Sequence, residues 1–198
     1  GKFMRTLILE TEIGKLLSPG VLNWLSGDVF TRQWYTYAYG HGSGLKLHVD
    51  NRFDKIYDYW KCKGDFGSCM TGRNRDEFYA YSVNAKAAYI TDEHDYIVAR
   101  AILFTDVTDQ HGKKWRLLER QYASNKDDTL KRLLIDKLIH GEYIDGYKVI
   151  GASCSDADAF VDISGNSLKN KKFEIDCRLD IRDTLSYQDS FKWYNHSK

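Results

Sequence analysis

The stretch AAYITDEHDYIVARAILF, residues 87–104, decides the fold of this chain. Its two halves, 87–91 and 96–104, are short runs of apolar, β-branched and aromatic residues, the composition typical of strands. Between them lies the polar sequence DEHD at 92–95, whose length and composition favour a compact antiparallel connection. The stretch therefore predicts a β-hairpin.

The residues that follow extend this hairpin into an antiparallel sheet. A third strand over 115–122 is predicted after the turn DQHG at 109–112. Further along, residues 173–181 alternate strictly between apolar and charged side chains, which places every apolar group on one face of a strand. A strand with one solvated face is typical of an antiparallel sheet rather than a doubly wound parallel one.

The clearest helix runs from about Asp127 to about Ile139. Ser124 and Asp127 resemble a capping box, and Gly141 stands where a C-terminal cap belongs. Its apolar residues recur at helical spacing, and charged residues occupy the opposite face: Leu130, Leu133, Leu134, Leu138 and Ile139 against Lys131, Arg132, Asp136 and Lys137. We therefore predict an α+β fold, an antiparallel sheet with helices packed mainly on one face.

The glycine-rich loop GHGSG at 40–44 marks the predicted domain boundary. We expect residues 1–44 to form a mostly helical or irregular segment, with a short helix from Pro19 to Trp24. Residues 45–198 should form a single α+β domain. Within it we expect a strand over 45–49, a helix from Asn51 to Trp60, and a loop over 61–72.

Composition excludes several classes of protein. Hydrophobic residues make up 42% and charged residues 29% of 198 residues, and there is one proline, which indicates a globular protein. The formal net charge of +1 does not favour a broad electrostatic grip on nucleic acid or on an anionic membrane. No stretch reaches the roughly 20 uncharged apolar residues of a membrane span. We expect a soluble, cytoplasmic protein with reduced cysteines.

Cys69 is the candidate nucleophile. It lies between Gly67 and Gly72 and just before Arg73 and Arg75; nearby cations lower the pKa of a thiol and stabilise the thiolate. The base would be His48 or His140. The alternative is that Cys69 and Met70 simply fill the core, since free cysteine is among the most buried residue types.

Arg100 is the second anomaly, because Val98, Ile102 and Phe104 share its strand face. A cation among apolar side chains requires a partner, and we expect Glu119 first and Asp189 second. Arg100 either fixes the sheet in a buried ion pair or binds an anion. The binding candidates are Arg100, Arg120, Arg73 and Asp189.

Two basic and aromatic clusters, 169–172 and 192–194, could stack on and neutralise a single nucleic-acid strand. A solvated loop and a docked tail would carry the same residues. The pairs Cys62 with Cys69 and His41 with His48 lack the short spacing of zinc ligands. We expect no metal and no cofactor.

Several motifs occur in a fixed order: FGSCM at 66–70, YAYSVN at 79–84, IVARAILF at 97–104, ERQY at 119–122 and SYQDSF at 186–191. This order resembles a group of uncharacterised proteins from phage and mobile-element genomes. In those proteins Gly, Trp, Asp and Pro stand where this chain has Ala99, Phe104, Glu119 and Ser186. The resemblance implies a phage- or prophage-type protein without an assigned catalytic residue, and it implies that Cys69, Arg100, Arg120 and Asp189 belong to one site or one core.

The leading hypothesis is a non-enzymatic accessory protein that binds a protein or nucleic-acid partner, because no complete catalytic constellation can be assembled from the sequence. The alternative is a small cysteine-nucleophile hydrolase or transferase. It would use Cys69 with His48 or His140 as base, and Arg100 or Arg120 to hold an anionic substrate group. The partner and the oligomeric state are not indicated by the sequence.

Overall fold

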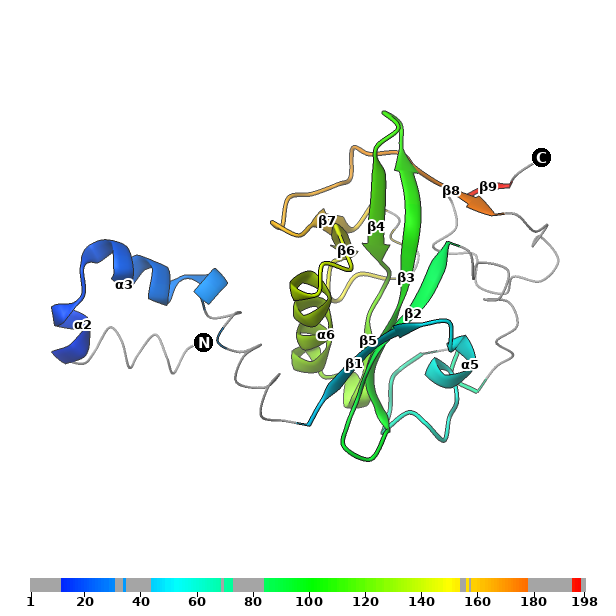
Figure 1. Cartoon of the computed structure of the whole chain (residues 1–198), viewed down its shortest axis with the longest axis horizontal. Helices are drawn as coiled ribbons and strands as arrows, with labels where there is room; N and C mark the ends of the chain where they lie inside the picture. The colour runs from blue at the N-terminus through cyan, green and yellow to red at the C-terminus, as the bar shows by residue number, and fades with distance from the viewer. Residues whose placement is uncertain are drawn as a thin grey trace. The chain divides into compact units, whose positions relative to one another are not determined.

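The computed structural model describes residues 12–30, 34, 44–68, 70–72, 84–153, 156, 158–177 and 194–196. The chain divides into two compact units, Gly1–Leu45 and Lys46–Lys198. The first unit contains the helices α2 (Glu12–Leu16) and α3 (Pro19–Ser26) (Figure 1). As predicted, α3 begins at Pro19, but it continues past Trp24 to Ser26. Ser18 caps it by accepting a hydrogen bond from the Val21 amide. Of the predicted boundary loop over 40–44, residues 40–43 lie outside the described residues.

The predicted hairpin is confirmed in the second unit. Strands β2 (Ala85–Thr91) and β3 (Ile97–Asp109) pair antiparallel. In the connection, the Asp92 carboxylate accepts hydrogen bonds from the His94 and Tyr96 amides, both at 3.0 Å. Asp95 takes a left-handed conformation with φ of 63°, which Asp tolerates better than most residues.

The third predicted strand is present but interrupted. Strands β4 (Lys114–Leu118) and β5 (Tyr122–Ala123) both pair antiparallel with β3. Residues 119–121 leave the ladder because side chains occupy their backbone groups. Glu119 Oε1 accepts from the Arg120 amide at 2.9 Å, and Gln121 Nε2 donates to the Glu119 carbonyl at 2.9 Å. The prediction of one continuous strand over 115–122 was therefore wrong.

The remaining strands complete a mixed sheet around β3. Their order is β1-β2-β3-β4-β6-β7, and β1 (Lys46–Asp50), β6 (Gly146–Lys148) and β7 (Phe160–Asp162) fill its outer positions. Strand β8 (Phe173–Cys177) pairs antiparallel with β3, and β9 (Tyr194–His196) pairs parallel with β8. Apart from β4–β6 and β8–β9, the described pairs between strands are antiparallel, so the α+β prediction is confirmed.

Strand β8 covers the first part of the alternating stretch. Phe173 and Ile175 are buried and Glu174 is exposed, as a period of two predicts. Residues 178–181 lie outside the part of the chain that the structure describes.

Helix α6 (Asp128–His140) confirms the predicted amphipathic helix and packs against β2, β3 and β5. Its N-cap is Asp127, which accepts from the Thr129 amide at 2.7 Å. Ser124 begins the 3₁₀ turn η2 (Ser124–Lys126) instead, so the predicted capping box was wrong. Asp136, expected on the solvated face, is 8% exposed because the buried surface of α6 extends past the leucines to Ile135.

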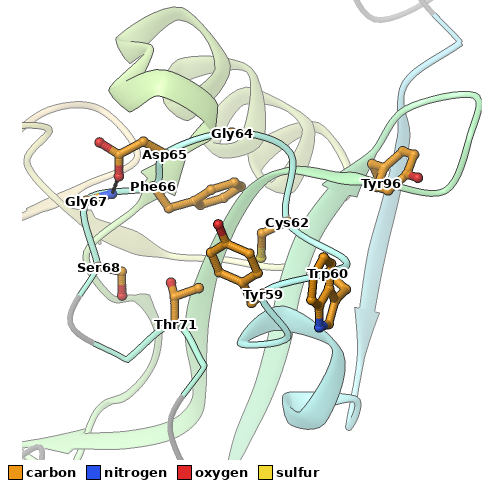
Figure 2. Close-up of a pocket in the computed structure, with 10 residues that line it drawn as sticks. All are labelled: Tyr59, Trp60, Cys62, Gly64, Asp65, Phe66, Gly67, Ser68, Thr71 and Tyr96. Atoms are coloured by element: carbon orange, nitrogen blue, oxygen red, sulfur yellow. Dashed lines mark hydrogen bonds between the residues drawn. The ribbon is translucent and has the colours of Figure 1, made fainter.

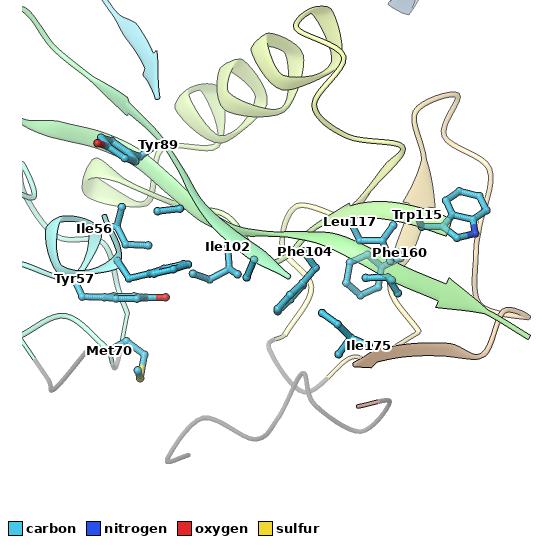
Figure 3. Packing of buried hydrophobic residues seen from close by; sticks show 14 of the residues in the cluster. Ile56, Tyr57, Met70, Tyr89, Ile102, Phe104, Trp115, Leu117, Phe160 and Ile175 are labelled. Atoms are coloured by element: carbon cyan, nitrogen blue, oxygen red, sulfur yellow. The ribbon is translucent and has the colours of Figure 1, made fainter. Parts of the chain in front are cut away.

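The main core lies on the face of the sheet away from α6 (Figure 3). It joins Tyr89, Ile102 and Phe104 of the hairpin to α5 (Phe53–Ile56).

The helix predicted over 51–60 is only the short helix α5. Asn51 accepts from Lys86 Nζ, and Asp58 accepts from the Trp60 amide at 2.8 Å, which turns the chain out of the helix. No helix in the described residues is long and apolar enough to cross a membrane.

Candidate functional site

A cavity of about 630 Å³ opens beside the first residues of β3 (Figure 2). Nine of its ten described lining residues come from one stretch of chain after α5, and the tenth, Tyr96, comes from the turn before β3. The full set is Tyr59, Trp60, Cys62, Gly64, Asp65, Phe66, Gly67, Ser68, Thr71 and Tyr96. Figure 2 shows Phe66, Tyr59 and Thr71 pointing toward one another across this space.

One wall is attached to the sheet by backbone hydrogen bonds. The Ile97 amide donates to the Lys61 carbonyl at 2.7 Å, and the Lys63 amide donates to the Ile97 carbonyl at 2.9 Å. Cys62 thereby forms a parallel bridge with Ile97. Trp60 and Cys62 are thus held in fixed positions next to β3.

The opposite wall is a loop that docks on the turn before α6. Gly64 and Gly67 have φ of 78° and 60°, a region that glycine enters without strain. A Cβ on Gly64 would lie 2.7 Å from Asn125 Oδ1, so the loop and the turn are in close contact. Asp65 Oδ2 pairs with Lys126 Nζ at 3.1 Å, and Asp65 Oδ1 accepts from the Gly67 amide at 2.7 Å.

Arg100 lies directly behind the cavity and is 1% exposed. Its guanidinium donates to Thr71 Oγ1 at 2.7 Å and to Cys62 Sγ at 3.5 Å, and both of these residues line the cavity. The guanidinium carbon also lies 4.6 Å from the ring centre of Tyr57 and 4.9 Å from that of Phe66. Stacking on aromatic faces is favourable for a desolvated guanidinium. The predicted burial of Arg100 is confirmed.

The expected ion pair between Arg100 and Glu119 is not formed. Glu119 Oε1 lies 2.6 Å from Lys148 Nζ, with both side chains buried. The Glu119 amide donates to the Ile102 carbonyl, whereas the residue opposite Arg100 in the sheet is Tyr122. The second expected partner, Asp189, lies outside the described residues.

Arg120 joins the same cluster through Tyr122. Its guanidinium lies 5.1 Å from the ring centre of Tyr122, and the Arg100 guanidinium lies 5.8 Å from that ring. Tyr122 is also the register partner of Arg100 in the β3–β5 pair. Thr71, Arg100 and Tyr122 therefore bring three segments of distant sequence, the loop after α5, β3 and β5, into contact.

The two predicted histidine bases are engaged elsewhere. His48 Nε2 lies 2.9 Å from Thr91 Oγ1, and its ring stacks on Tyr89. Burial lowers the pKa of His48, and the nearby Lys55 cation lowers it further. His140 Nδ1 lies 2.8 Å from the Asp136 carbonyl. Neither histidine is among the described residues that line the cavity. Cys69 and Arg73 lie outside the part of the chain that the structure describes.

The aromatic rim was missed by the sequence analysis. Trp60 is 81% exposed, Tyr59 is 66% exposed and Tyr96 is 45% exposed. Their positions depend on the bridge between Cys62 and Ile97, which has no periodic signal in the sequence. The dipeptide Tyr59-Trp60, next to a predicted loop, was the available clue.

The ionic groups around the cavity are balanced. Lys63 pairs with Asp92 at 2.7 Å, Lys55 pairs with Asp95 at 3.0 Å, and Lys126 pairs with Asp65.

Within the described part of the chain, no cluster of three or more His, Cys, Asp or Glu side chains could hold a metal ion. The lining offers ring faces, the hydroxyl groups of Ser68, Thr71 and two tyrosines, one carboxylate and one thiol as contacts for a bound group. Comparisons with protein-family models, with curated proteins and with solved structures found no match to this chain.

Proposed function

We propose that this chain is a non-enzymatic accessory protein of a phage or mobile element that binds a protein partner at the aromatic rim of the cavity. The observation that carries the proposal is the exposure of Tyr59 and Trp60 beside a preformed cavity. Tryptophan and tyrosine dominate the energetics of protein interfaces because they bury large areas with few rotatable bonds. The phage-type origin rests on the motif order between 66 and 191.

The charges near the cavity favour a protein partner over a nucleic acid. A single strand is held by cations that neutralise successive phosphates. Here Lys55, Lys63 and Lys126 are each paired with an aspartate, and the formal net charge of the chain is +1. Aromatic rings surrounded by balanced charges are typical of a protein interface with a polar rim.

The walls of the cavity also favour binding with little rearrangement. The Ile97 backbone fixes one wall, the Asp65–Lys126 pair fixes the other, and Arg100 links Cys62 to Thr71 from behind. A site held in this way loses little conformational entropy when a ligand enters. We infer that a side chain of the partner enters the cavity while Tyr59 and Trp60 pack around it.

Photo-crosslinking in the cell of origin tests this function. A photo-reactive phenylalanine analogue replaces Trp60 in one variant and Tyr143, which is 42% exposed after α6, in the control. We expect one protein adduct at position 60 and none at position 143. A nuclease-sensitive adduct at position 60 would assign the site to nucleic acid, and the same adducts at both positions would contradict a specific site.

A second candidate is a cysteine-nucleophile enzyme. Ser68 and Thr71, on either side of Cys69 in the sequence, line the cavity. The guanidinium groups of Arg100 and Arg120, which this candidate assigns to an anionic substrate group, both lie near the Tyr122 ring, and Arg100 is behind the lining residues. Brief iodoacetamide treatment of the folded protein tests this candidate, followed by mass spectrometry of all four cysteines. Labelling of Cys69 ahead of Cys62, Cys154 and Cys177 would support an activated thiolate. Protection of Cys69 would eliminate it.

A further inference from the structure

Strand β1 ends the sheet, and its outer edge is not covered by another described strand. Residues Lys46–Asp50 pair antiparallel with β2 on one side, and β1 is the first strand in the sheet order. Within the described residues no strand pairs with its other side. A strand edge presents a row of backbone donors and acceptors that can accept another strand.

The sequence of β1 complements itself when reversed. It reads KLHVD, so an antiparallel copy centred on His48 places Lys46 opposite Asp50 and Leu47 opposite Val49. Directly opposed side chains in an antiparallel pair share a face and lie about 5 Å apart. Each end then has a pair of opposite charges, and the apolar pair lies between them. A shift of one residue would place Lys46 opposite Val49 and lose this match.

The edge is also held in a strand conformation before any partner arrives. The His48 ring stacks on Tyr89 with centroids 4.8 Å apart, and Tyr89 Oη donates to Asp50 Oδ2 at 2.8 Å. Lys46 is exposed and makes no ion pair with the described residues. A preorganised edge loses less conformational entropy when a strand is added.

We propose that a second copy of this chain adds its β1 antiparallel to β1, about a two-fold axis at His48, so that the two sheets become continuous. This interface is distinct from the cavity and does not depend on the function proposed there. Because the paired edge is only five residues long, the dimer is weak, and the fraction of the chain that is dimeric rises with protein concentration.

Cysteine crosslinking of the full chain tests the register. In the proposed dimer residue 48 faces its own copy, whereas residue 46 lies four positions away from its copy. After sedimentation has shown the concentration-dependent dimer, mild oxidation of the His48→Cys variant should give a disulfide that joins the two copies at position 48. The matched Lys46→Cys variant should not form its homodisulfide, because a disulfide needs Cβ atoms about 4 Å apart. A monomer at every concentration, or a dimer that does not crosslink at position 48, would overturn the proposal.

A charge exchange gives a second test. Lys46→Asp places two carboxylates opposite each other at each end of the interface, and Asp50→Lys places two ammonium groups there. Each variant alone should dimerise roughly tenfold more weakly. Mixed together, they should form a heterodimer in which both ends are again complementary. Circular dichroism checks that Asp50→Lys folds, because Asp50 also accepts from Tyr89. If the two variants are folded but form no preferred heterodimer, a second copy does not pair with this edge and the proposal is wrong.

Discussion

Glu119 and Lys148 form an ion pair that is shielded from solvent. The Lys148 side chain has no exposed surface, and its Nζ lies 2.6 Å from Glu119 Oε1. Gln121 Nε2 donates to the Lys148 carbonyl at 3.0 Å and ties β6 to the segment after β4. A pair in this environment stabilises the fold only while both charges are present, because either charge alone is left desolvated.

We therefore expect Glu119→Gln and Lys148→Met each to lower the free energy of unfolding by about 3–5 kcal/mol. The double variant should lose less than the sum of the two, since the stranded charge is then absent. Urea unfolding of the four proteins measures this coupling. Asp54→Asn breaks the exposed pair with Arg52 and is the control, with an expected change of at most about 1 kcal/mol. Additive effects of the two buried substitutions would contradict the coupling.

Arg100 shows what a sequence can predict about a buried charge. The apolar neighbours of Arg100 on its strand correctly predicted that it is buried. They could not identify its neighbours, because Thr71 and Cys62 come from a loop whose path depends on the bridge to Ile97. The partner of Glu119 was equally hidden, since β6 is a three-residue strand without a periodic pattern.

At the scale of elements, α6 stabilises the sheet through its leucines. Leu134 has no exposed surface, and α6 packs against β3, β5 and β2. We expect Leu134→Ala to lower the free energy of unfolding by about 2–5 kcal/mol, from lost burial and the cavity that remains. Arg132→Ala on the exposed face of the same helix is the control for helix propensity. Equal small effects from both substitutions would show that α6 does not depend on the leucine face.

The loop that forms the cavity wall depends on its close approach to η2. Gly64→Ala would combine strain at positive φ with a collision against Asn125 Oδ1. Gly165→Ala shares the positive φ, but a Cβ there meets nothing within 4 Å. We expect Gly64→Ala to lower the melting temperature more than Gly165→Ala and to reduce crosslinking at position 60. Equal melting temperatures would mean that the loop moves without cost.

Elements with a long, regular pattern were predictable, and short elements were not. The hairpin consists of two long apolar runs on either side of a polar turn, and α6 carries several helical periods of hydrophobicity. Helix α5 has four residues, and β6 and β7 have three each, which is too few for a period to appear. The break at 119–121 arises from side-chain bonds to the backbone, and hydropathy does not report them.

At the scale of the whole second unit, Asp109 links the β3–β4 turn to the segment that enters β8. Lys171 Nζ donates to Asp109 Oδ2 at 2.9 Å, and Trp115 Nε1 donates to the same oxygen at 3.0 Å. The pair holds together parts of the chain that are 62 residues apart. The hydrogen bond from Lys171 holds the pKa of Asp109 well below its ordinary value, and the Trp115 and backbone donors lower it further.

This lowered pKa fixes how stability depends on pH. The unfolded chain binds a proton at Asp109 at about pH 4, whereas the folded protein binds it only at lower pH. The contribution to stability is therefore present above about pH 4 and is lost on acidification. Lys171→Met should therefore destabilise the protein at neutral pH and flatten the loss of stability between about pH 4 and pH 2. Lys114→Met, which breaks the exposed pair with Asp106, should leave this slope close to that of the wild type. Thermal melts at each pH measure both variants, and an unchanged acid slope in Lys171→Met would show that the Asp109 contact does not join the turn to β8 in solution.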